Sequence, residues 1–139
     1  MFVLDASVTA AWFFPDEFNP LSEAVLDRLR EEEAVVPAIW HVEMANILVV
    51  AQRRQRLTEA AVTTALRVLA SLPIVTAEPT DMDRLVGAAR ELGLSTYDVS
   101  YLVVAMREGL AIATQDKELR RAAERAGVEL MAEMNPGSG

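Results

Sequence analysis

The 139-residue chain contains no cysteine and a single histidine. No apolar run reaches the roughly 18 residues that a membrane-spanning helix needs. The lack of cysteine excludes disulfide bonds, thiolate nucleophiles and zinc–thiolate centres. The lack of a long apolar run predicts no insertion in a membrane. No basic segment followed by a long apolar stretch comes after Met1, so we expect no secretory signal and a cytoplasmic location.

Positive charge is also scarce. The chain has 13 Lys and Arg against 21 Asp and Glu, which gives a formal net charge of −8. This balance argues against a broad phosphate-binding surface. Basic residues gather only in segments 53–56 and 117–121, and each segment fits either a solvated helix face or a local basic edge. An excess of acids also arises where carboxylates collect around a cation.

Hydrophobic residues, in contrast, make up 52% of the chain. Short apolar runs with strand character alternate with helical patterns, and these runs cover residues 2–4, 34–36, 73–76, 110–114 and 128–131. Alternation of this kind predicts a parallel sheet covered by helices on both faces. We therefore expect an α/β fold, a three-layer α/β/α sandwich with five parallel strands. A single domain over residues 1–133 and a flexible tail over 134–139 complete this prediction.

Four acidic residues stand at notable places in this pattern. Asp5 ends the first strand, Glu43 lies in an otherwise apolar helix, Asp98 opens the apolar helix around residues 97–106, and Asp116 follows the fourth strand. A lone acid at a helix N-terminus is explained by the helix dipole. In open α/β sheets, however, ligands bind beyond the carboxyl ends of the strands. We expect Asp5, Asp98 and Asp116 to meet at that edge, with Glu43 beside them.

Converging carboxylates repel each other. Two unit charges about 4 Å apart cost roughly 4 kcal/mol at an effective dielectric constant of about 20. A protein relieves this repulsion by protonating the acids or by binding a cation. Oxygen ligands without cysteine favour the hard ions Mg²⁺ and Mn²⁺. Such an ion can promote phosphodiester cleavage by activating water and holding the phosphate.

Three polar residues accompany the acids and are expected to orient them. Ser7 follows Asp5 by two positions, Thr114 precedes Asp116 by two, and Asn46 shares a helix face with Glu43. Each can hold a carboxylate in place or bind the metal through water, and Ser7 and Thr114 can also act as local caps. His41 is given no catalytic role, since a lone histidine is more often structural.

Four short segments, taken together in their order along the chain, carry a resemblance to a known family. They are Val3-Leu4-Asp5-Ala6-Ser7, Glu43-Met44-Ala45-Asn46, Leu94-Ser95-Thr96-Tyr97-Asp98-Val99-Ser100-Tyr101 and Ala113-Thr114-Gln115-Asp116. With these segments the chain resembles PIN-domain proteins, specifically the VapC-type toxins of type II toxin–antitoxin pairs, from Phe2 to Met131. The resemblance implies a five-stranded parallel sheet. It also implies an Mg²⁺- or Mn²⁺-dependent endoribonuclease that cuts structured RNA, such as tRNA or ribosomal RNA.

The resemblance also assigns roles and partners. It implies that Asp5, Glu43, Asp98 and Asp116 are catalytic, and that Asp5, Asp98 and Asp116 bind the metal. It implies a homodimer and a cognate VapB-type antitoxin, which lays a helix in an apolar groove and presents an arginine to the acids. Trp12, Phe13 and Phe14 are the residues that we expect in this groove.

Three alternatives have different sequence requirements. A receiver-like signalling domain, which also binds Mg²⁺, needs paired acids after strand one and an acceptor Asp ending strand three, whereas this third strand ends in Val75-Thr76. A phosphatase of the haloacid dehalogenase type needs a second Asp where the chain has Ser7. A non-catalytic α/β binding protein, with acids that only cap helices, would be favoured by an absence of metal binding.

Overall fold

One parallel sheet organises the protein, for which a computed structural model describes residues 1–132. Its strands are β1 (Phe2–Leu4), β2 (Ala34–Val36), β3 (Ile74–Thr76) and β4 (Ile112–Ala113), in the order β3-β2-β1-β4. Val3 of β1 lies opposite Val35 of β2 and Ile112 of β4. All residues of β1, β2 and β4 are buried, as expected for strands covered on both faces. The expected tail over 134–139 lies outside the described residues.

The expectation of five strands is wrong for the described part of the chain, where the sheet has four. Segment 128–131 forms a single parallel bridge, between Leu130 and Ile112. Ile112 N–H donates to Glu129 O at 2.9 Å, and Met131 N–H donates to Ile112 O at 2.9 Å. The segment cannot pair further because its partner β4 is only two residues long.

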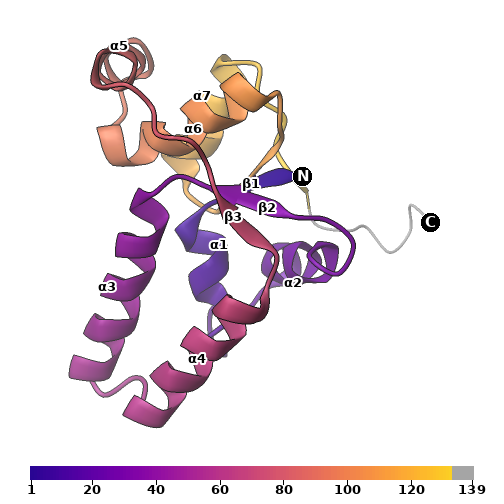
Figure 1. Ribbon diagram of the computed structural model, residues 1–139, viewed down its shortest axis with the longest axis vertical. Helices are drawn as coiled ribbons and strands as arrows, with labels where there is room; N and C mark the ends of the chain where they lie inside the picture. Colours follow the sequence, from indigo (N-terminus) through magenta and orange to yellow (C-terminus); the bar gives the residue numbers. More distant parts are fainter. Residues whose placement is uncertain (133–139) are drawn as a thin grey trace.

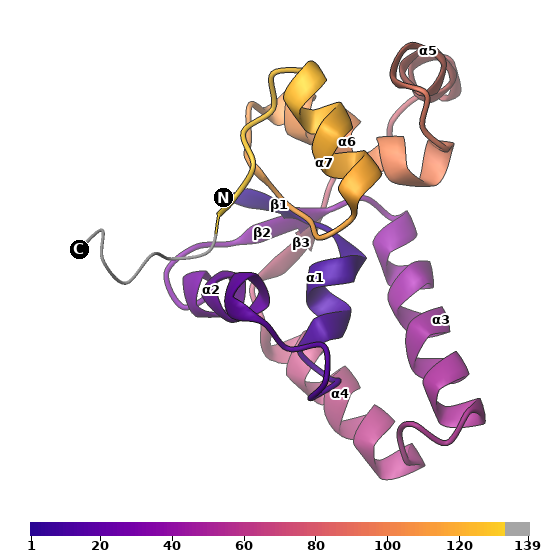
Figure 2. The same ribbon diagram turned by 180° about the vertical axis from the view of Figure 1, so that it is seen from behind.

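Seven helices surround the sheet in the described residues. They are α1 (Ala6–Ala11), α2 (Pro20–Arg28), α3 (Ile39–Arg53), α4 (Glu59–Ser71), α5 (Met82–Leu92), α6 (Thr96–Glu108) and α7 (Lys117–Arg125). Figures 1 and 2 show α5, α6 and α7 on one side of the sheet and α1 to α4 on the other. The predicted three-layer α/β arrangement is therefore confirmed. No helix in residues 1–132 has the length and apolar character needed to cross a membrane.

Among the described helices, α6 has the largest number of buried residues. Its buried residues are Val99, Tyr101, Leu102, Val103, Val104 and Ala105. They belong to the same core as Leu4 and Ile112 or to the smaller apolar cluster under α5. Each large aliphatic side chain contributes about 1.5–3 kcal/mol when fully buried. This packing fixes the position of α6, and with it the first helical turn that carries Asp98.

Side-chain caps fix the helix ends that face the carboxyl edge of the sheet. Ser95 Oγ accepts a hydrogen bond from Asp98 N–H at 3.1 Å at the start of α6. Asp116 Oδ1 accepts one from Leu119 N–H at 2.9 Å at the start of α7. Gly109 ends α6 in the left-handed region, with φ of 65°, where a residue with a Cβ is strained. Both acids are thus held at defined helix N-termini.

We expect Ser95→Ala to lower the free energy of unfolding by about 1 kcal/mol, because the N–H of Asp98 loses its acceptor. Urea denaturation followed by circular dichroism measures this change. Ser95→Asn restores a capping oxygen and should stay close to the unmodified protein. Equal losses in both variants would contradict the capping role.

Candidate active site

The four acids predicted from the sequence come from four elements and lie near one another. Asp5 directly follows β1, Glu43 lies in the second turn of α3, Asp98 in the first turn of α6, and Asp116 caps α7. The charge of Asp5 acts on the pKa of Glu43 and of Asp98. That of Asp116 acts on the pKa of Asp5 and of Asp98. The fold therefore gathers all four carboxylates at one edge.

Strand order explains why this edge is a site. Chain connections run from β1 toward β2 and β3 on one side, whereas β4 pairs with β1 on the other. The point where strand order reverses lies between β1 and β4, and ligands of open α/β sheets bind at such a point, beyond the carboxyl ends of the strands. Asp5 and Thr114 follow directly after these two strands.

Asp5 is the most deeply placed acid of the four, with 6% of its surface exposed. Its Oδ2 accepts hydrogen bonds from Ser7 Oγ at 2.6 Å and Thr114 Oγ1 at 2.7 Å. The two hydroxyls in turn accept backbone N–H groups, Ser7 from Gln115 at 3.0 Å and Thr114 from Asp116 at 3.1 Å. In residues 1–132 no side-chain hydroxyl bonds to Oδ1 of Asp5. The backbone N–H of Ala6 also acts on this carboxyl group.

Three of these acids hold protons more readily than ordinary carboxyl groups. Burial raises the pKa of Asp5, although the hydroxyls of Ser7 and Thr114 oppose the shift. Burial also raises the pKa of Glu43 and of Asp98, and neighbouring carboxylates add to both shifts. A bound cation would reverse the repulsive part of these shifts, because it favours the charged form of each acid.

Tyr101 is a residue of this site that the sequence reasoning missed. Its phenol donates a hydrogen bond of 2.6 Å to Oε1 of Glu43, which is 58 positions away in the chain. The side chain is fully buried, and burial followed by the bond to Glu43 raises the pKa of Tyr101. One signal was available: a buried phenol usually needs a hydrogen-bond partner, and Tyr101 lies three positions after Asp98 on the same helix.

Asn46 and His41 lie apart from the acids. Asn46 is exposed on α3, and in the described part of the chain its side chain makes no hydrogen bond to an acid, so its predicted role in orienting Glu43 has no counterpart there. His41 lies edge-on against Trp40 and is 2.8 Å from Thr76 Oγ1 through its Nε2. This contact links α3 to β3, which is a structural role.

Metal binding can be judged from the donor set. In residues 1–132 no three His, Cys, Asp or Glu side chains are arranged closely enough to hold an ion. The donors themselves are carboxylate and hydroxyl oxygens, the ligands that Mg²⁺ and Mn²⁺ prefer. By their donor chemistry, although not by their spacing in the described residues, these side chains suit a hard divalent cation.

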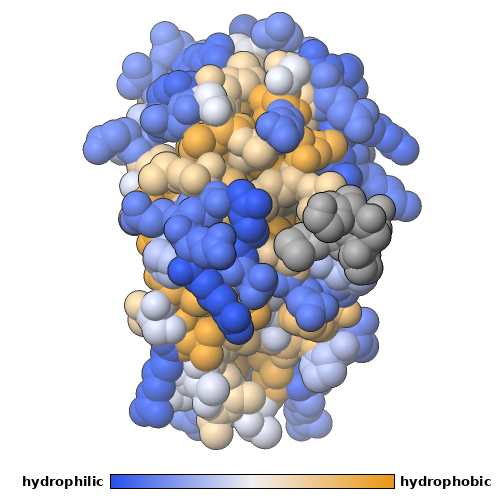
Figure 3. All heavy atoms as spheres, turned by 90° about the vertical axis from the view of Figure 1, so that its right-hand side faces the viewer, coloured by the Kyte–Doolittle hydropathy of each residue, from blue (hydrophilic) through white to orange (hydrophobic). Residues whose placement is uncertain are grey.

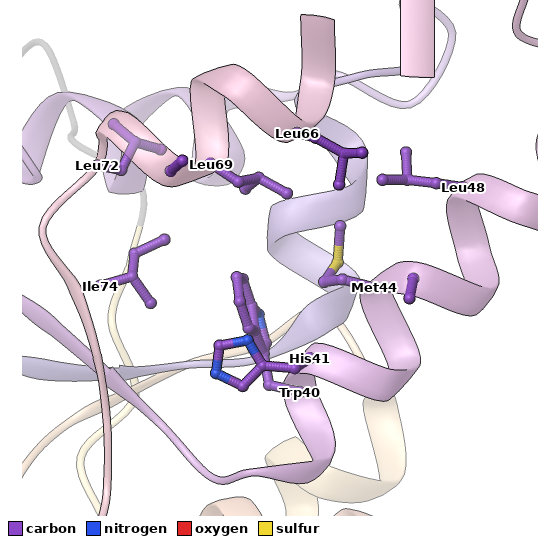
Figure 4. Close-up of a pocket in the computed structure, with 10 residues that line it drawn as sticks. Trp40, His41, Met44, Leu48, Leu66, Leu69, Leu72 and Ile74 are labelled. Carbon is purple, nitrogen blue, oxygen red and sulfur yellow. The ribbon is translucent and has the colours of Figure 1, made fainter. Parts of the chain in front are cut away.

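Two apolar grooves lie on the other side of the sheet. The first, of about 390 Å³, is lined by Trp12, Phe13, Leu26, Leu57, Ala61, Thr64, Ala65 and Val68. The second, of about 300 Å³, lies between α3 and α4, where Figure 4 shows Met44 and Leu48 facing Leu66. The expectation for Phe14 is wrong, because its ring is buried in the core with the Arg56 guanidinium 4.4 Å from its centroid. Trp12 and Phe13 do line the first groove.

The sequence and the structure of this chain are both similar to those of known proteins. The sequence matches the PIN domain family over residues 2–125. Comparison with curated proteins gives no match. The structure is similar to that of PAE2754 from Pyrobaculum aerophilum, with a TM-score of 0.71 and 26% sequence identity. That similarity covers 87% of this chain and 83% of PAE2754.

Two further solved structures share the fold at lower sequence identity. VapC20 of Mycobacterium tuberculosis, described as a Sarcin-Ricin loop cleaving toxin, is 16% identical with a TM-score of 0.61 and covers 98% of this chain and 100% of its own. FitAcB from Neisseria gonorrhoeae is 20% identical with a TM-score of 0.63, covering 95% of this chain and 97% of its own.

The raised pKa values predict how stability depends on pH. Below the ordinary pKa values of 3.8 for Asp and 4.5 for Glu, the acids are protonated in both the folded and the unfolded state. Their contribution to the free energy of unfolding is then fully present. It is lost as the pH rises through the raised folded-state values, because the folded chain holds protons more tightly than the unfolded chain. We expect the metal-free protein to lose stability relative to Asp98→Asn as the pH rises from about 4.

Urea denaturation in EDTA, carried out on both proteins from pH 4 to 7, measures this difference. Added Mg²⁺ should restore the stability of the unmodified protein at pH 7 more than that of Asp98→Asn. Parallel stability curves for the two proteins would show that Asp98 is not destabilised by its surroundings.

Proposed function

We propose that this chain, which belongs to the PIN domain family, is a divalent-metal-dependent endoribonuclease and the toxin of a toxin–antitoxin pair. The observation that carries the proposal is the group of four acids at the switch point of the sheet, where Asp5 is held by two hydroxyls. The structural likeness to VapC20 and FitAcB supports the toxin assignment. Structured RNA of the translation machinery, cut in the cytoplasm, is the proposed substrate.

Asp5, Asp98 and Asp116 are the proposed ligands of Mg²⁺ or Mn²⁺. When bound, such an ion activates water as a nucleophile near neutral pH and stabilises charge on the scissile phosphate. Ser7 and Thr114 keep Asp5 oriented, so that one carboxylate oxygen remains available. Glu43, whose pKa is raised by burial, is suited to accept a proton from the attacking water.

The net charge of −8 confines RNA contacts to local basic segments. Segment 117–121 begins directly after Asp116 and carries Lys117, Arg120 and Arg121 at the start of α7. Arg120 donates a hydrogen bond of 2.8 Å to Thr114 O, which holds its guanidinium beside the acids. We propose that the RNA phosphates near the metal site bind to segment 117–121. Its Lys and Arg side chains would offset the repulsion between the acids and the RNA.

A helix of the antitoxin is the proposed occupant of the groove formed by Trp12, Phe13 and α4. The groove is apolar, and half-buried aromatic side chains serve as anchors in many interfaces. On the face drawn in Figure 3, hydrophobic patches lie between hydrophilic side chains. A homodimer completes the proposal, supported by apolar side chains exposed on α3 and α5, Val42, Val49, Met82 and Val86.

Asp98→Asn tests the nuclease. The substitution removes one charge from the proposed metal site without changing volume, so we expect the chain to fold and cleavage to fall at least 100-fold, on the order seen when a key electrostatic group is removed. Purified protein free of partner is incubated with total cellular RNA and Mg²⁺ or Mn²⁺, and an EDTA reaction runs alongside. Discrete fragments that need both the metal and Asp98 are the expected result.

Cleavage that persists in EDTA or in Asp98→Asn would reject this site as the source of the activity. Calorimetric traces that are identical with and without added metal would show that no metal binds, and would favour a non-catalytic binding protein instead.

Thr64→Arg tests the partner groove. Thr64 is exposed on α4 and lines the first groove, so a long charged side chain there should block an apolar helix without disturbing the core. We expect at least a tenfold loss of affinity for the antitoxin that co-purifies with the unmodified chain, a change of about 1.4 kcal/mol. The control is Leu66→Arg, on the same helix but in the second groove. Loss of binding only in Leu66→Arg would assign the antitoxin to the second groove.

A further inference from the structure

We infer that Tyr101 is a positioning residue, whose phenol fixes the carboxylate of Glu43 so that one of its oxygens stays free beside the proposed ligands of the divalent cation. The inference rests on the proposed function and deepens it, since it concerns how the metal site is organised. Its basis is the hydrogen bond from the Tyr101 hydroxyl to Oε1 of Glu43, at 2.6 Å.

The donor of this bond, the Tyr101 hydroxyl, is held rigidly, whereas the acceptor, the Glu43 carboxylate, is on a flexible side chain. Tyr101 lies in α6 with 0% of its surface exposed, packed into the main core of the protein. Its hydroxyl position is therefore set by the packing of the whole helix. Glu43 is only half-buried on α3, and a glutamate has several rotatable bonds whose freedom opposes ordering. The phenol gives this flexible side chain one fixed anchoring point.

The bond also selects which oxygen of Glu43 is free. Oε1 is taken by the phenol, so Oε2 is left to interact with a cation directly or through water. Asp5 and Asp98 are the charges that act on Glu43, which means that its carboxylate faces the same group of acids. Asp5 is arranged in the same way, with Oδ2 taken by the hydroxyls of Ser7 and Thr114.

Filling space in the core does not require the hydroxyl, which meets Glu43 and the backbone N–H of Ala6. Phenylalanine would fill the same space in α6, and burying a phenol costs free energy that phenylalanine avoids. The cost is offset because the phenol has a charged acceptor, and hydrogen bonds to charged groups are stronger than those between neutral groups. The hydroxyl therefore acts at Glu43, which belongs to the acid group, rather than in the core.

A double-mutant cycle on metal affinity tests the inference. Dissociation constants for Mn²⁺ are measured on the metal-free full chain by electron paramagnetic resonance, for the unmodified protein, Tyr101→Phe, Glu43→Gln and the double variant. We expect Tyr101→Phe to weaken Mn²⁺ binding by roughly 10- to 100-fold, the usual effect of losing a group that orients a ligand. In the Glu43→Gln background the same change should have almost no further effect, because coupled residues are not additive.

Tyr97→Phe is the matched control. Tyr97 lies one turn earlier on α6 with 61% of its surface exposed, so this variant loses the same hydroxyl without a partner in the acid group. It should bind Mn²⁺ like the unmodified protein. Thermal unfolding of each metal-free variant shows whether a change in affinity comes from a loosened fold.

The outcomes separate this inference from the proposed function. If the unmodified protein binds no Mn²⁺, both fail together. If it binds Mn²⁺ and Tyr101→Phe binds equally well, only the role of Tyr101 is wrong. A loss in Tyr101→Phe that persists undiminished in the Glu43→Gln background would likewise overturn it, since the hydroxyl would then act independently of Glu43.

Discussion

The buried carboxylate of Asp5 is the constraint on which the site depends. An acid with 6% exposure at the end of a fully buried strand is costly unless its oxygens are satisfied. Two hydroxyls satisfy one oxygen, and each hydroxyl is itself fixed by a backbone N–H near the start of α7. The same contacts that make the charge tolerable therefore join β1, the end of β4 and α7 into one unit. Asp116 takes its place from this unit, because its own N–H is one of the donors.

The rest of the acid group is brought in by packing rather than by polar contacts. Helix α6 is apolar on most faces, so its burial decides where Asp98 lies, and Ser95 then orders the first turn. Glu43 is carried by α3, which covers the opposite side of the sheet from α6 (Figure 1). The phenol of Tyr101 links these two layers at the edge that carries the acids. The four charges are thus held by three kinds of support: hydroxyl bonds, helix caps and core packing.

Much of the fold was predictable because the apolar runs in the sequence coincide with the strands that the sheet contains. Strands β1 and β2 match the predicted bounds, since each is an apolar run stopped by a residue that ends a strand, Asp5 or Pro37. The fifth strand failed because its apolar residues say nothing about the length of its partner, and β4 offers only two residues.

The site was predictable in part for a related reason. Topology alone directed Asp5, Asp98 and Asp116 to one edge, because the ends of parallel strands and the starts of the following helices meet there. The bond between Tyr101 and Glu43 spans 58 positions and depends on side-chain reach across two layers, which no periodicity encodes. Asn46 shows a limit of spacing: its separation from Glu43 gives the same helix face, but spacing does not decide which side chain is buried, and Asn46 is exposed.

The bond between Thr114 and Asp5 joins residues 109 positions apart. During synthesis on the ribosome, Thr114 therefore emerges 109 residues after Asp5. A chain made only as far as residue 113 therefore contains Asp5 but lacks the Thr114 hydroxyl that holds it and lacks Asp116. The hydrogen-bonded arrangement around Asp5 can therefore form only after every residue from Asp5 to Asp116 has been made.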